Sequence, residues 1–168
     1  MPMILQSEAA ECGLACLVMI ARYHGHEVDL PSLRRRFSTS LKGASLAQII
    51  HIAQALNFEA RPLRAELSHL AHLKAPCIIH WNLNHFVVLK RVGRDTIEVL
   101  DPARGVCRMP VGEFSKHFTG VALELRPGSD FSPIKEVKRI TLRALTGHIS
   151  GLKRVLFQVF GLALAIEH

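Results

Sequence analysis

Hydrophobic residues recur every three to four positions in the first third of the chain, a spacing that indicates helices. The stripe between Ser7 and Tyr23 predicts a helix with Ser7 as its N-cap. Pro31 fits the first turn of a short second helix, because the N–H that proline lacks has no partner there anyway. Ser45 is a suitable N-cap for a third helix, predicted over 46–57.

The pattern changes beyond residue 57, where short apolar runs alternate with turn residues. The predicted strands are 58–63, 77–81, 85–89, 96–100, 105–109 and 120–125, and two short helices are predicted at 67–73 and 113–118. Helices in the first half and strands in the second half predict an α+β domain, with the helices packed against an antiparallel sheet.

Glycine, serine and proline gather at 127–133, a composition typical of a linker. We therefore expect a domain over residues 1–127, a linker over 128–134 and a separate segment over 135–168. That last segment is basic and contains the apolar run 155–166, which is shorter than the roughly 20 residues that cross a bilayer. It fits either a helix packed on the domain or a juxtamembrane helix leading into a membrane span.

The composition is that of a folded protein, with 49% hydrophobic and 21% charged residues. The net charge of +7 is concentrated toward the C-terminus, since residues 131–168 hold six Lys or Arg and two Asp or Glu. A nucleic-acid-binding domain usually carries such charge on its folded surface among aromatic residues, so we expect no nucleic acid partner. Four cysteines, together with an N-terminus that lacks a signal-peptide pattern, predict reduced thiols inside a cell.

Cys12 is the candidate nucleophile. It lies near the start of the first predicted helix, where unpaired N–H groups and the helix dipole stabilise a thiolate. Gly13 would leave room for an approaching carbonyl, and Gln6 could donate a hydrogen bond to an oxyanion. Glu8 and Glu11 would oppose thiolate formation unless they point away, so a nearby imidazolium must supply the activation.

His85 and Asp101 are the expected partners of this thiol, because His85 opens one predicted strand and Asp101 ends the next. In adjacent antiparallel strands the carboxylate can accept a hydrogen bond from the imidazole and leave the other ring nitrogen for the thiol. His80 is the main rival base. A zinc site is a further alternative, although the chain has no Cys-x-x-Cys pair. Its ligands would be Cys12, Cys16, His24 and His26.

Three motifs resemble one known family. The segments QSEAAECGLAC, HWNLNHFVVL and VLDPARG are similar, in order and spacing, to the bacteriocin-processing peptidase domain of ABC exporters, above all the colicin V type. The resemblance covers about residues 4–127 and implies a papain-like cysteine protease fold. It also implies roles for four residues: Cys12 as nucleophile, Gln6 as oxyanion donor, His85 as general base and Asp101 as the carboxylate that orients His85.

The same resemblance implies the biological setting. The substrate would be a precursor peptide whose leader ends in Gly-Gly or Gly-Ala, bound as an amphipathic helix in an apolar groove. Phe37 and Leu41 are candidates for that groove. The full-length exporter would be a homodimer with transmembrane and nucleotide-binding domains, and the peptidase would lie on the cytoplasmic face of the bacterial inner membrane. The peptidase domain would need no cofactor, whereas the nucleotide-binding domain would use ATP and Mg²⁺.

Three other functions stay open at this point. A branch of the family that has lost the cysteine only docks leader peptides, and the presence of Cys12 argues against that function. A transferase or deamidase could use the same thioester chemistry. A non-enzymatic basic module would rest on the C-terminal charge alone.

Overall fold

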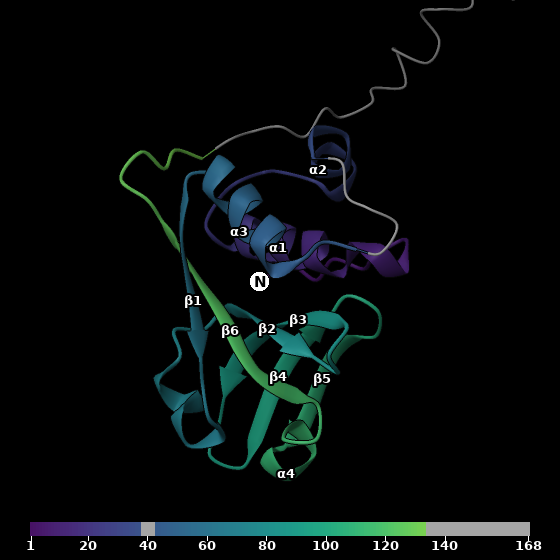
Figure 1. Ribbon diagram of the computed structural model, residues 1–168, viewed down its shortest axis with the longest axis vertical. Coiled ribbons are helices and arrows are strands. Elements are labelled where there is room, and N and C mark those ends of the chain that lie inside the picture. The colour runs from purple at the N-terminus through teal and green to yellow at the C-terminus, as the bar shows by residue number, and fades with distance from the viewer. Residues whose placement is uncertain (38–42, 134–168) are drawn as a thin grey trace, which may run out of the picture. The chain divides into compact units, whose positions relative to one another are not determined.

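The computed structural model describes residues 1–37 and 43–133, and three helices form its N-terminal layer (Figure 1). They are α1 (Cys12–Tyr23), α2 (Leu30–Arg36) and α3 (Leu46–Ala55), with the short 3-10 turn η1 (Ala9–Glu11) in front of α1. The N-caps follow the sequence, because Asp29 accepts the N–H of Ser32 and Ser45 accepts the N–H of Gln48.

The second layer is one antiparallel sheet with the strand order β1-β6-β2-β3-β4-β5. The strands are β1 (Phe58–Arg64), β2 (Cys77–Trp81), β3 (His85–Val92), β4 (Thr96–Asp101), β5 (Gly105–Pro110) and β6 (Phe118–Pro127). The 3-10 turn η2 (Leu67–His72) connects β1 to β2, and α4 (Val111–Phe114) lies between β5 and β6. The α+β prediction is confirmed, although α4 ends earlier than expected because β6 already pairs with β2 at Phe118.

Side chains on the two faces of the sheet enter two separate cores, since successive residues of a strand point to opposite sides. Phe86 and Val88 of β3 join the cluster formed with α1 and α3. Val87 and Leu89 join a second cluster on the other face. That second cluster also contains Leu70, Trp81, Ile97 and Phe114. The start of β3 packs against α1, and the residue after β4 accepts the N–H of Gln6 on the segment before α1.

The start of the predicted linker packs against the domain. Gly128 donates its N–H to the carbonyl of Asn57 at 2.9 Å, and the ring of Phe131 lies 5.0 Å from that of Phe58 and 4.2 Å from that of His26. The basic segment predicted at 135–168 lies outside the described residues, as does Leu41. No helix within the described ranges is long and apolar enough to cross a membrane.

Candidate active site

Cys12 is the first residue of α1, and only 4% of its surface is exposed. The prediction that this helix begins at Ser7 is wrong. Residues Ala9–Glu11 form a separate 3-10 turn, because the Glu11 carboxylate accepts the N–H groups of Ser7 at 3.0 Å and Glu8 at 3.1 Å. The later start places the sulfur at the helix N-terminus itself, where the unpaired N–H groups of the first turn favour an anion.

The carboxylate of Glu11 is paired with groups other than the thiol of Cys12. Its carboxylate forms an ion pair with Arg34 of α2 in addition to the two backbone hydrogen bonds. Glu11 thus stabilises the turn before the helix, and the guanidinium of Arg34 offsets its effect on a neighbouring thiolate.

His85 and Asp101 are joined by a short hydrogen bond across adjacent strands. His85 is the first residue of β3 and Asp101 the last residue of β4, and His85 Nε2 lies 2.7 Å from Asp101 Oδ1. The backbone N–H of Ala103 donates to the same carboxylate oxygen at 2.8 Å. Burial raises the pKa of Asp101, but these hydrogen bonds outweigh it and hold the pKa below its ordinary value. Asp101 is therefore ionised and fixes the direction of the imidazole.

The imidazole of His85 also interacts with Cys12. Burial of the ring lowers its pKa, but hydrogen bonds to Asp101 and Cys12 and the negative charge at both positions raise the pKa to about 9. Because Nε2 is engaged by Asp101, Nδ1 is the nitrogen available to the thiol. An imidazolium held beside a cysteine sulfur is the arrangement that activates a cysteine nucleophile.

Gln6 lies on the segment that precedes η1, close to the residues that follow β4. Its backbone N–H donates to the carbonyl of Pro102 at 2.9 Å, which ties this segment to the residue after Asp101. Its side-chain Oε1 is buried and has no hydrogen-bond partner among the described residues. This unpaired oxygen can accept a hydrogen bond from a ligand, and the donor that an oxyanion would need is the Nε2 amide of the same side chain.

Comparison with known proteins places this arrangement in a family. The model of the peptidase C39 family matches residues 1–130. The chain belongs to the peptidase C39 family. It is a cysteine peptidase domain, and its papain-like fold is confirmed.

The relatives of this C39 domain are larger proteins. The chain is 49% identical over 166 residues to the colicin V secretion/processing ATP-binding protein CvaB of Escherichia coli, covering 99% of the chain and 24% of that protein. It is 34% identical over 136 residues to the lactococcin-G-processing and transport ATP-binding protein LagD of Lactococcus lactis, covering 77% of the chain and 19% of that protein. The chain therefore spans about a quarter or less of these curated relatives.

Two solved peptidase structures share the fold. One is a double glycine motif protease from an AMS/PCAT transporter in complex with the leader peptide, with a TM-score of 0.71, 38% identity, and coverage of 75% of this chain and 91% of that chain. The other is the peptidase domain of Streptococcus ComA, with a TM-score of 0.68, 28% identity, and coverage of 74% of this chain and 96% of that chain.

The rival residues have other partners in this C39 domain. The thiol of Cys16 is fully buried and donates to the carbonyl of Phe86 at 3.4 Å, and burial together with the charges of Cys12 and Asp101 raises its pKa well above the ordinary value. His80 Nδ1 lies 2.9 Å from the hydroxyl of Thr119, and burial lowers the pKa of His80. The thiol of Cys16 is therefore inaccessible to a substrate, and Nδ1 of His80 is committed to Thr119.

The alternative zinc site does not form. Cys12 and His24 lie at opposite ends of α1, roughly 18 Å apart along a helix that rises about 1.5 Å per residue. His26 Nε2 instead lies 3.0 Å from the carbonyl of Leu56. Within residues 1–37 and 43–133, no group of three or more His, Cys, Asp or Glu side chains is placed to hold a metal ion.

The interpretation of Gly13 as free space for a carbonyl is wrong. A Cβ on this residue would meet Cδ1 of Ile49 at 2.7 Å and Cγ1 of Ile49 at 3.1 Å, so the missing side chain faces α3. Gly13 instead lets α1 and α3 approach closely, and its role is in packing.

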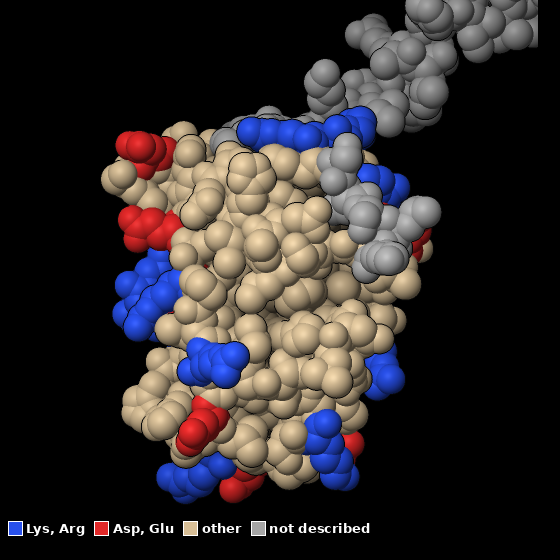
Figure 2. All heavy atoms as spheres, in the orientation of Figure 1, with Lys and Arg blue, Asp and Glu red and all other residues tan. Residues whose placement is uncertain are grey.

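A cavity of about 700 Å³ is lined by residues that flank His85 in the chain. Asn84 and Phe86, the neighbours of His85 on either side, both contribute to its wall. The remaining lining residues are Gly43, Ala44, Ser45, Leu46, Gln48, His80, Leu83 and Val121. Figure 2 shows that charged side chains are few in the middle of one face of the domain.

Sequence reasoning missed this cavity, because its wall combines the start of α3, the turn between β2 and β3, and β6. The groove candidate Phe37 packs against the core instead, with Arg36 over its ring. The one local signal was the Asn82-Leu83-Asn84 turn immediately before His85.

Proposed function

We propose that this domain removes the leader from a precursor peptide by cleaving after a double glycine, using Cys12 as nucleophile. The observation that supports it most directly is the hydrogen bond from His85 to Asp101, together with the pKa of His85, which Asp101 and Cys12 raise to about 9. The printed functions of the relatives support the substrate class, since they process colicin V and lactococcin G. A solved relative is a double glycine motif protease bound to a leader peptide.

The proposed reaction proceeds through an acyl-enzyme. The Cys12 thiolate attacks the carbonyl carbon of the second glycine, and the resulting oxyanion accepts hydrogen bonds from the Gln6 side-chain amide and the Cys12 backbone N–H. His85 Nδ1 then donates its proton to the departing amine, so the C–N bond breaks and a thioester remains on Cys12. Water, deprotonated by the same nitrogen, attacks the thioester and releases the leader with a free carboxylate.

Asp101 acts throughout by holding His85. Its hydrogen bond to Nε2 keeps Nδ1 directed at the sulfur, and its charge stabilises the imidazolium that exists before each proton donation. A narrow entrance at Cys12 that excludes any Cβ would explain a requirement for glycine at the two positions before the bond.

The cavity beside His85 is the proposed docking site for the rest of the leader. Leu46, Phe86 and Val121 supply apolar wall surface from three different elements. Such a surface suits the apolar face of an amphipathic helix or an extended apolar segment.

The setting of the full-length protein is also a proposal, because the chain spans only a quarter of its colicin V relative. We place the peptidase on the cytoplasmic face of a bacterial inner membrane, in a homodimeric exporter with transmembrane and nucleotide-binding domains. ATP and Mg²⁺ would serve the nucleotide-binding domain, and the peptidase chemistry would need no cofactor.

The test is cleavage of a synthetic precursor that carries a Gly-Gly leader, followed by mass spectrometry. We expect two products split after the second glycine, with a free carboxylate on the leader, and no cleavage of a matched precursor with valine at that position. Cys12→Ala should abolish cleavage but retain leader binding, and Cys16→Ala should retain cleavage. Leader binding without any product from the unaltered domain would indicate a docking domain instead. A leader product captured by an added amine would indicate a transferase.

A further inference from the structure

The turn between β2 and β3 holds a leucine in an unusual backbone conformation. Asn84 donates its N–H to the carbonyl of Trp81 at 3.3 Å, which closes a β-turn with Asn82 and Leu83 at its centre. Asn82 has φ of 50° and Leu83 has φ of 66°. Asparagine tolerates this left-handed region, whereas a leucine there is strained because its Cβ approaches the backbone.

Leu83 also keeps its side chain in solvent. Its exposed fraction is 81%, more than that of any other large hydrophobic residue described. Glycine or asparagine at this position would suit the turn better and would expose no apolar surface. The fold itself therefore gains nothing from a leucine here.

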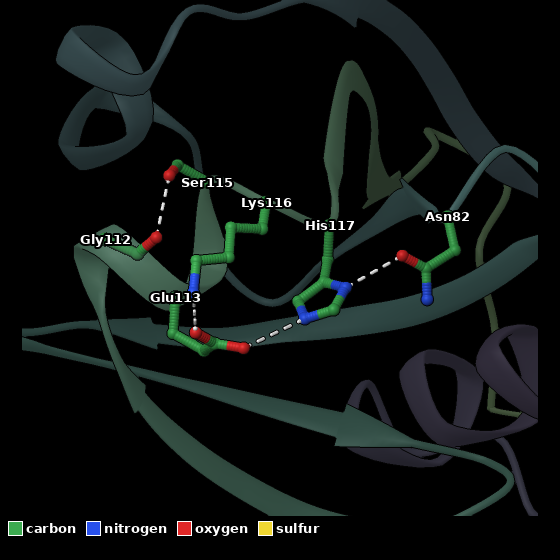
Figure 3. A network of polar contacts seen from close by, with 6 residues as sticks. All are labelled: Asn82, Gly112, Glu113, Ser115, Lys116 and His117. Atoms are coloured by element: carbon green, nitrogen blue, oxygen red, sulfur yellow. Dashed lines mark hydrogen bonds and ion pairs between the residues drawn. The ribbon is translucent and has the colours of Figure 1, made fainter.

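Neighbouring contacts fix the turn despite this strain. Asn82 donates its backbone N–H to the carbonyl of His117 at 2.9 Å, and its side-chain Oδ1 lies 2.8 Å from His117 Nδ1. The other ring nitrogen of His117 lies 3.3 Å from Glu113 of α4, which also pairs with Lys116. Figure 3 shows the His117 ring between the amide of Asn82 and the carboxylate of Glu113. A strained residue held from outside in this way is typical of a ligand-binding position.

The turn forms part of the cavity wall and directly precedes the candidate catalytic histidine in the chain. Leu83 and Asn84 both line the cavity, and His85 follows them directly on the chain. An apolar side chain at this point can contact a peptide that runs from the cavity into the bond-breaking site.

We propose that Leu83 determines substrate specificity by contacting an apolar side chain of the leader, on the segment that precedes the two glycines. This inference rests on the proposed function. The leader segment is the occupant because Asn84 and Phe86, the chain neighbours of His85 on either side, line the same cavity as Leu83. Its apolar chemistry matches the wall formed by Leu46, Phe86 and Val121.

The experiment compares Leu83→Gly with Leu83→Met and with Val106→Ala, which alters another exposed apolar residue outside the cavity. For Leu83→Gly we expect the thermal midpoint to stay level or rise, because glycine relieves the left-handed strain. KM for the Gly-Gly precursor should rise about tenfold with kcat little changed, since an apolar contact made before the reaction is lost. Leu83→Met should restore KM, and Val106→Ala should leave it unaltered.

Alanine replacements of the apolar leader residues then identify the contact. One replacement should raise KM for the unaltered domain and have little further effect in Leu83→Gly. An unchanged KM in Leu83→Gly, or a lower thermal midpoint together with a lower kcat, would overturn the inference while leaving the proposed function standing. If the unaltered domain cleaves no double-glycine precursor, the proposed function itself fails, and the role of Leu83 falls with it.

Discussion

His85 Nε2 lies 2.7 Å from Oδ1 of Asp101, at the point where the start of β3 meets the end of β4. The contact commits one ring nitrogen to the carboxylate and leaves the other for the sulfur of Cys12. Because the two residues stand on paired strands, the backbone sheet itself sets the geometry, and no long loop has to order before the thiol can be activated.

His85→Ala should reduce kcat for precursor cleavage about a thousandfold, because the imidazole of His85 interacts with Cys12 and is the proposed proton donor and acceptor. His80→Ala is the matched control, since His80 is bonded to Thr119 instead. Its kcat should stay within about threefold of the unaltered domain, as expected of a residue outside the proton transfers, and any effect should fall on KM because His80 lines the cavity. Equal losses in the two variants would show that the base is wrongly assigned.

The basic limb of the pH profile of kcat/KM should reflect His85, whose pKa is raised to about 9. Activity falls as pH rises through this value, because the imidazolium that protonates the leaving amine is lost. Asp101→Asn removes a negative charge that raises this pKa, so the limb should move to lower pH by about one unit. Asp95→Asn, at the exposed turn before β4, should leave the limb in place. A limb that does not move in Asp101→Asn would contradict the role given to the carboxylate.

Gly13→Ala should destabilise the domain by about 1–3 kcal/mol through overpacking against Ile49. Ile49→Val removes the Cδ1 atom that the new Cβ would meet, at a cost of about 1 kcal/mol on its own. The double variant should therefore be more stable than the sum of the two losses predicts, by at least about 0.5 kcal/mol in urea unfolding. Strict additivity, or a large loss of kcat in Gly13→Ala with normal stability, would show that Gly13 leaves room for the substrate carbonyl after all.

The sequence was most informative where chemistry depends on residue type and on the ends of regular elements. Cys12, His85 and Asp101 could be proposed because a helix start and two neighbouring strand ends are readable from local patterns, and the three motifs resembled a family. The structure then brought these residues together. Their catalytic roles stay predictions until they are tested.

What the sequence could not predict depends on contacts between distant segments. Gly13 looked like a gap beside the nucleophile, but the direction of its missing Cβ is set by Ile49, thirty-six residues later on α3. The sequence predicted that α1 begins at Ser7, but it begins at Cys12, because the Glu11 carboxylate binds backbone N–H groups before the helix and pairs with Arg34. Leu83 read as an ordinary turn residue, since neither its positive φ nor its place in the cavity wall is visible in a residue pattern.

The most direct measurement of the central claim uses a leader peptide whose second glycine ends in an aldehyde in place of the scissile amide. An activated thiol adds to this carbonyl and forms a reversible hemithioacetal, whose tetrahedral carbon is detected by NMR when the aldehyde carbon is labelled with carbon-13, and a crystal structure of the adduct locates the sulfur that carries it. We predict one adduct, on Cys12, that is lost in Cys12→Ala and strongly reduced in His85→Ala. An adduct on Cys16 or another residue, or cleavage of the precursor by Cys12→Ala at the normal rate, would contradict the account.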